Sequence, residues 1–299
     1  MAPLRGLLDP DFMRELEALR RRLEVRARSA GPGVGIARRR GSSAEFEEHR
    51  AYEPGDDLRR IDWLAFARKG APVVKQFRAE EDYVLRLLVD ASASLGFGDP
   101  SKIEVSRRLA AALGYMALRS SERVQVLVAT QPDPSARALA RAHPLRRGRS
   151  GLPALLRDLD AVAAAGQANL ARAIDETVER SRKPGLLVVL SDFFDGGPVT
   201  LALSRARAAQ HDVALVQVTS DAEVNPSYEG DFALVDSETG QSVDVTLDAA
   251  ALEAYVLRYT GLVEELRGFA RKHSATYVRA LNTEPLEPVV RRFVARAID

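Results

Sequence analysis

The chain has 299 residues, of which 46% are hydrophobic and 28% charged, the balance of a globular protein with a substantial core. Its formal net charge is +1, so the molecule as a whole has no strong attraction for nucleic acid or anionic lipid. It contains no cysteine, which excludes disulfides, thiol catalysis and thiolate metal sites and fits a reducing compartment.

The apolar stretches predict a cytoplasmic protein without a membrane span. No apolar run approaches the roughly 20 residues that a helix needs to cross a bilayer. The first residues soon become charged and lack the apolar stretch of a signal peptide. The longest apolar runs, such as 186–190, have the length of buried strands.

The N-terminal part of the chain, 1–80, is predicted to be a helix followed by an accessory region. Apolar residues at helical spacing predict a helix over 11–29, which glycines and a proline then end. The stretch 38–75 is dense in charge and turn residues without sustained periodicity, so we expect it to be irregular or to contain a hairpin. The second domain is predicted to span 81–299.

In this second domain, short apolar strands alternate with helices. Strands that are apolar on both faces indicate a mostly parallel sheet covered by helices on both sides, an α/β, doubly wound, Rossmann-like fold. In such sheets, ligands bind outside the carboxyl ends of the strands, near the switch in strand order. The expected strands are 83–89, 124–129, its hairpin partner 136–143, 185–190, 213–218, the hairpin 232–235 and 242–245, and 276–280. The expected helices are 101–119, 152–162, 170–182, 199–210, 248–273 and 286–297.

Two of the predicted strands end in side chains that carry oxygen. The first runs into Asp90, Ser92 and Ser94, a D-x-S-x-S pattern, and a later strand runs into Ser191 and Asp192. Oxygen ligands with few formal charges suit a hard cation such as Mg²⁺. The same residue types are also common at the starts of helices, where they cap backbone N–H groups. The pattern alone is consistent with either role.

Sequence motifs for catalysis and for nucleic-acid binding are missing. None of the four histidines belongs to a recognisable catalytic triad, and neither G-x-S-x-G nor the Walker A pattern occurs. The arginine clusters lie among acidic residues and the pI is about 8.0, so we interpret them as solvated faces or contacts for an acidic partner. We therefore expect no catalytic residues, with a metal-dependent hydrolase as the alternative.

The strand-end pattern resembles the metal-ion-dependent adhesion site of von Willebrand A domains, from about residue 82 to the C-terminus. In that family an Asp and two Ser come from one loop, a Thr from a second and an Asp from a third, and an acidic residue of the partner completes the coordination. The residues that match are Asp90, Ser92, Ser94 and Asp192. Ala168 aligns with the family's Thr and has no side-chain oxygen. The site could bind an ion more weakly through water, use Asn169 instead, or have lost the metal.

The block 52–63, with the sequence YEPGDDLRRIDW, is the most distinctive in the chain. Together with Phe77-Arg78-Ala79-Glu80 and the DASAS pattern, it resembles the bacterial domain of unknown function 58 family, from about residue 33 onward. Members are typically encoded beside MoxR-type AAA+ ATPases, which are thought to act as chaperones in maturing other complexes. The resemblance implies an adaptor whose partner is such an ATPase or its client. The block itself could instead pack the accessory segment onto the sheet.

Overall fold

The computed structural model describes residues 6–30, 46–52, 61–70, 72–77, 83–120, 122–131, 140–194 and 196–298. The chain forms two compact units, one made of Met1–Ala37 with Tyr83–Asp299 and the other of Arg38–Asp82. The sequence pattern places its first helix with the accessory region, whereas in the structure helix α1 (Pro10–Ala30) belongs to the larger unit. The reason is that its apolar stripe, which includes Phe12, Leu16 and Leu19, is buried in the core of that unit.

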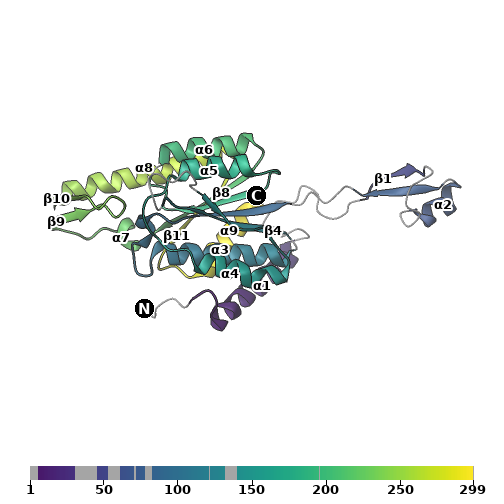
Figure 1. Ribbon diagram of the computed structural model, residues 1–299, viewed down its shortest axis with the longest axis horizontal. Helices are drawn as coiled ribbons and strands as arrows, with labels where there is room; N and C mark the ends of the chain where they lie inside the picture. Colours follow the sequence, from purple (N-terminus) through teal and green to yellow (C-terminus); the bar gives the residue numbers. More distant parts are fainter. Residues whose placement is uncertain are drawn as a thin grey trace. The chain divides into compact units, whose positions relative to one another are not determined.

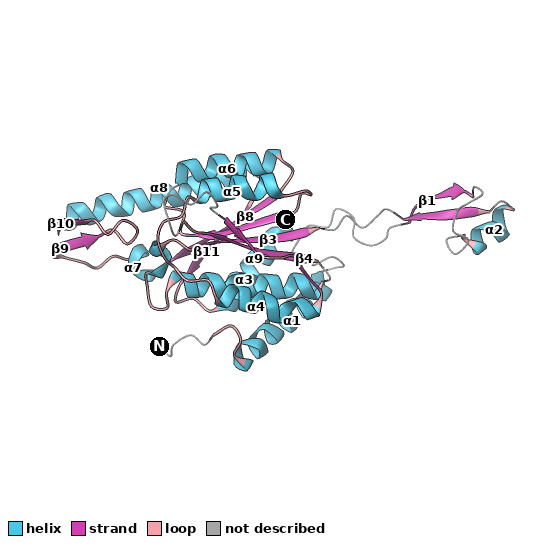
Figure 2. Ribbon diagram, viewed as in Figure 1, coloured by secondary structure: helices cyan, strands magenta, loops and turns pink. Residues whose placement is uncertain are grey.

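The larger unit is built around a central sheet with helices on both sides (Figures 1 and 2), and the sheet has seven strands among the described residues. The strand order is β11-β8-β7-β3-β4-β5, and β6 also pairs with β4. The first five of these strands are parallel, while β5 and β6 run antiparallel to β4. The predicted doubly wound, mostly parallel α/β sheet is therefore confirmed. The strands are β3 (Val84–Asp90), β4 (Arg123–Ala129), β5 (Ala140–Ala142), β6 (Arg146–Arg147), β7 (Leu186–Ser191), β8 (Asp212–Thr219) and β11 (Thr276–Leu281).

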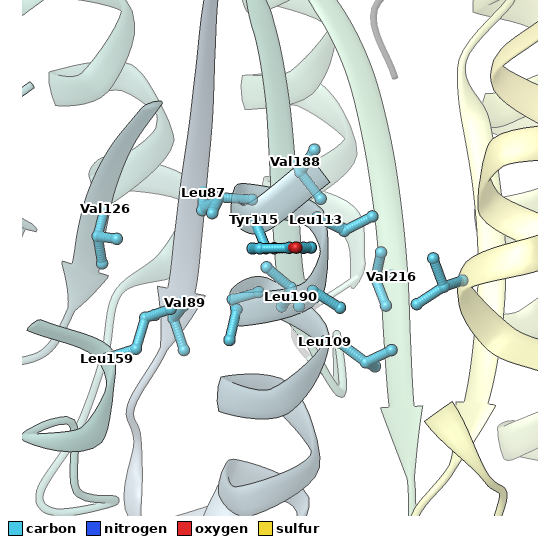
Figure 3. Close-up of a cluster of buried hydrophobic side chains, with 14 of the residues drawn as sticks. Leu87, Val89, Leu109, Leu113, Tyr115, Val126, Leu159, Val188, Leu190 and Val216 are labelled. Atoms are coloured by element: carbon cyan, nitrogen blue, oxygen red, sulfur yellow. The ribbon is translucent and has the colours of Figure 1, made fainter. Parts of the chain in front are cut away.

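Helices cover both faces because successive strand residues point to opposite sides and both sets are apolar. Leu87 and Val89 face a cluster formed with α1, α3, α4 and α9, part of which Figure 3 shows around α3. Leu88 and Val189 face a second cluster formed with α5, α6 and α8. The helices are α3 (Lys102–Arg119), α4 (Leu152–Asp160), α5 (Leu170–Arg180), α6 (Gly196–Ala208), α7 (Asp221–Val224), α8 (Ala249–His273) and α9 (Leu286–Ile298). None of the described helices is long and apolar enough to cross a membrane.

The strand order reverses direction between β3 and β7. From β3 the chain continues through β4 to the edge at β5, and it then returns to β7 on the other side of β3 and continues outward through β8 and β11. Loops that leave the carboxyl ends of β3 and β7 therefore diverge to opposite faces. Such a switch point leaves a crevice outside the sheet, where ligands of α/β proteins bind.

Two smaller pieces complete the described chain. The predicted hairpin is present as β9 (Gly230–Val235) and β10 (Ser242–Leu247), which pair only with each other among the described strands. In the smaller unit, β1 (Phe46–Ala51) and β2 (Val73–Phe77) form an antiparallel pair, with helix α2 (Trp63–Lys69) between them in sequence. Most of the distinctive block, 53–60, lies outside the described residues, as does 136–139 of the predicted partner of β4.

Candidate functional site at the carboxyl ends of the central strands

The loop after β3 gathers the oxygens of the D-x-S-x-S pattern. Asp90 is buried, and its Oδ1 accepts a hydrogen bond of 2.9 Å from the backbone N–H of Ser92. Ser92 precedes a short 3₁₀ turn, Ala93–Gly96, but its side chain makes no capping hydrogen bond. Its hydroxyl instead lies 3.0 Å from the hydroxyl of Ser94. The capping interpretation therefore does not account for the Ser92 side chain.

The end of β7 joins this loop through two further hydrogen bonds. Ser191 donates from Oγ to Asp90 Oδ2 over 2.6 Å, and Ser94 donates from Oγ to Asp192 Oδ2 over 3.2 Å. The parallel register explains this meeting, because Val89 pairs with Leu190 and the next residues leave the sheet side by side. The structure thus brings together all four predicted site residues and Ser191.

Burial and charge together shift the titration of Asp90. Burial, followed by repulsion from Asp192, raises the pKa of Asp90 to about 6, although hydrogen bonds from Ser191 and Ser92 favour the charged form. Nearby positive charge stabilises two carboxylates that lie close together at a buried sheet edge in their charged form. A bound cation or a cationic side chain can supply that charge.

Lys102 supplies part of this positive charge, although no sequence pattern points to it. Lys102 begins helix α3 and is only 1% exposed, and its Nζ lies 2.8 Å from Asp192 Oδ2 and 2.5 Å from Glu223 Oε1. Burial disfavours the ammonium, but attraction to Asp192 and Glu223 and hydrogen bonds to both raise the pKa of Lys102 overall. Lys102 therefore remains charged and connects α3, the end of β7 and α7. No local motif marks it, because its partners are 90 and 121 residues away.

The oxygen-bearing residues at the strand ends, which are Asp90, Ser92, Ser94, Ser191 and Asp192, line a pocket of about 220 Å³ together with residues of other segments. Ala168 precedes α5 and Leu170 is its first residue, Phe193 and Phe194 follow β7, and Val199 belongs to α6. The turn of the β9–β10 hairpin contributes the remainder of the wall. The hairpin residues in the lining are Asp236, Ser237 and Glu238. The site is therefore an accessible pocket rather than a closed part of the core.

The donor set suits a hard divalent cation. Among the described residues, no three His, Cys, Asp or Glu side chains are close enough together to hold a metal. The candidate donors are two carboxylates and hydroxyls, which are the oxygen ligands that Mg²⁺ prefers. Ala168 lines the pocket without an oxygen, while Asn169 uses its side-chain oxygen to cap α5 by accepting a 2.9 Å hydrogen bond from Arg172 N–H. Asn169 therefore does not replace the missing threonine oxygen in this structure.

Comparison with known proteins establishes the family. The family model described as "Protein of unknown function DUF58" matches residues 48–260, and the chain belongs to this family. An uncharacterized protein of Mycobacterium tuberculosis is 35% identical over 216 residues, which are 70% of this chain and 66% of that protein. A counterpart in Mycobacterium bovis matches to the same extent, so the chain spans just under two thirds of the length of these relatives.

Among solved structures, the conserved hypothetical protein BatB from Bacteroides thetaiotaomicron resembles this chain. The two are 15% identical with a TM-score of 0.45, and the match covers 72% of this chain and 98% of that one.

Proposed function

We propose that this chain is a cytoplasmic protein-binding adaptor and not an enzyme, and that its pocket at the sheet switch point contacts the partner. The observation that carries the proposal is the convergence of Asp90, Ser92, Ser94 and Asp192 on an accessible pocket. Their placement at the reversal in strand order, where α/β folds bind ligands, supports it. The resemblance to von Willebrand A adhesion sites also supports it.

A divalent cation such as Mg²⁺ is the second part of the proposal. When bound, it would supply positive charge that a carboxylate of a partner protein can approach. The hydroxyls of Ser92 and Ser94 would face the ion, and Asp90 and Asp192 would balance its charge. Ser191 and the backbone of Ser92 hold Asp90 in place through hydrogen bonds. Because Lys102 already neutralises part of the charge of Asp192, we expect weak metal binding.

The partner in this proposal is a MoxR-type AAA+ ATPase or its client, as the family resemblance implies. The chain would present a client to the ATPase or hold a complex during its maturation.

The metal site is tested by restoring the missing oxygen. Ala168→Thr adds a hydroxyl to the pocket, whereas Ala168→Val adds a side chain of the same shape without one. We expect calorimetric Mg²⁺ or Mn²⁺ affinity to rise about tenfold, or about 1.4 kcal/mol, in Ala168→Thr but not in Ala168→Val. Asp90→Ala should abolish the binding. Absence of binding to the native chain and to Ala168→Thr would refute the metal site.

The partner is tested with a purified MoxR-type ATPase from the same organism. We expect the immobilised chain to retain the ATPase in Mg²⁺ buffer and to lose it in EDTA or with Asp90→Ala. Retention under all conditions would support the adaptor role but show that the ATPase contacts a surface other than the pocket. No retention of the ATPase under any condition would remove the proposed partner.

A further inference from the structure

The β9–β10 hairpin has one apolar face and a second face on which two carboxylates lie among Ala233, Val235 and polar residues. In its antiparallel register, Leu234 lies opposite Val243 and Phe232 opposite Val245, so these four side chains share one face. On the other face, Asp231 lies opposite Thr246 and Asp244 opposite Ala233. A 2.7 Å hydrogen bond from Thr246 Oγ1 to Asp231 Oδ1 agrees with this arrangement.

The apolar face is largely uncovered. Phe232, Leu234 and Val243 are 37%, 49% and 60% exposed, although each is a residue that folding normally buries. The hairpin lies beside the first part of α8 in Figures 1 and 2, where Val256 and Leu257 are exposed as well. Contiguous apolar surface of this kind marks interaction sites on folded proteins.

The charge around the hairpin has one sign. Residues 225–257 contain no Lys or Arg, although the whole chain has 43 in 299 residues. The same stretch contains seven acidic residues, which are Glu229, Asp231, Asp236, Glu238, Asp244, Asp248 and Glu253. A surface with this potential attracts cationic partners and repels acidic ones.

Both edges of the hairpin lack a neighbouring strand among the described residues. Open edges present unpaired backbone N–H and C=O groups, which an added strand can satisfy. In a strand that joins the edge, alternate side chains point to opposite faces. A segment that alternates apolar and basic residues would therefore place its apolar side chains on the same face as Leu234 and Val243 and its cations on the same face as Asp231 and Asp244.

We propose that the β9–β10 hairpin binds an extended, alternating apolar and basic segment of a partner protein by strand addition. The hairpin turn, with Asp236 and Glu238, lines the same pocket as Asp90. A segment bound to the hairpin is thus held next to the candidate site. The inference extends the proposed protein-binding function but requires neither a metal nor Asp90.

The test uses the full chain and a labelled peptide of about ten residues that alternates valine and lysine. Two comparison peptides alternate serine with lysine and valine with glutamate. By fluorescence anisotropy, we expect the valine–lysine peptide to bind at least about tenfold more tightly than either. Its affinity should fall as salt rises from about 50 to about 500 mM, because exposed charges are then screened.

Variants locate the binding surface. Leu234→Ser combined with Val243→Ser removes the apolar contact, and Asp231→Asn combined with Asp244→Asn removes the charge while keeping polar side chains. Each pair should weaken binding by about tenfold or more. Leu201→Ser is the matched control, since Leu201 is 60% exposed on α6 and is not part of the hairpin, and it should have no effect.

Three results would overturn the proposal. The first is that the serine–lysine peptide binds as well as the valine–lysine peptide, because charge attraction alone would then explain the binding. The second is a concentration-dependent dimer that the Leu234→Ser, Val243→Ser variant abolishes, because a second copy would then occupy the face. The third is loss of peptide binding in EDTA or with Asp90→Ala, which would assign it to the pocket. Unchanged binding under those two conditions supports the proposal even if the metal site fails its own test.

Discussion

At the scale of single residues, Lys102 determines how the loops at the sheet edge are held. Its buried ammonium contacts carboxylates from the end of β7 and from α7, which are themselves largely buried. Lys102→Met would leave Asp192 and Glu223 without that charge, and removal of one partner from a buried pair costs about 3–5 kcal/mol. We expect a loss of this size in the free energy of unfolding, measured with urea at neutral pH.

The control for this prediction is an ion pair on the surface. Arg205 pairs with Asp175 through two hydrogen bonds, but Arg205 is solvent-exposed and Asp175 is only half-buried. Arg205→Met should change stability little, because exposed pairs are screened by water and salt. Equal effects of the two substitutions would contradict the structural role of Lys102.

At the scale of elements, the packing of α3 against α4 and the sheet depends on Gly114. A Cβ at this position would lie 2.6 Å from Leu155 Cδ2 and 3.3 Å from Leu87 Cδ1. Overpacking costs about 1–3 kcal/mol, while replacing a helical glycine by alanine gains only about 1 kcal/mol. We therefore expect Gly114→Ala to lower the free energy of unfolding.

The same substitution on α8 should have the opposite sign. Gly261 is exposed, and a Cβ added there would meet no atom within 4 Å. Gly261→Ala should therefore raise the free energy of unfolding by about 1 kcal/mol through helix propensity alone. Stabilisation by both substitutions would show that α3 can move away from α4 without cost.

At the scale of the whole molecule, the core of the larger unit is self-contained. Neither of its two buried clusters includes a described residue between 46 and 77. Replacing residues 38–82 with a Gly/Ser linker of about 15 residues, in the flexible regime, should leave the sheet folded. We expect the melting temperature by circular dichroism to change by no more than about 4 °C, which corresponds to about 1–2 kcal/mol for a unit of this size. An insoluble product or a much larger fall would show that 38–82 contributes to that core.

The order and type of the main elements of the larger unit follow from local sequence patterns. A continuous apolar strand such as 186–190 can bury its side chains only if both faces of the sheet are covered, so local composition already indicates an α/β sheet. The same reasoning located Asp90, Ser92, Ser94 and Asp192 at strand ends. It also found the β9–β10 hairpin, because its two short apolar runs flank a turn at Gly240.

The contacts between residues distant in sequence could be seen only in the folded chain. The strand order places β7 beside β3, and this brings Ser191 to Asp90 and Ser94 to Asp192. The fold also brings Lys102 into contact with Asp192. Helix α1 belongs to the larger unit, although the chain leaves that unit for 38–82 before it returns. These contacts depend on strand order and helix packing, which act over tens to hundreds of residues. Periodicity and short motifs report only on residues that are neighbours along the chain, so they could not predict these long-range contacts.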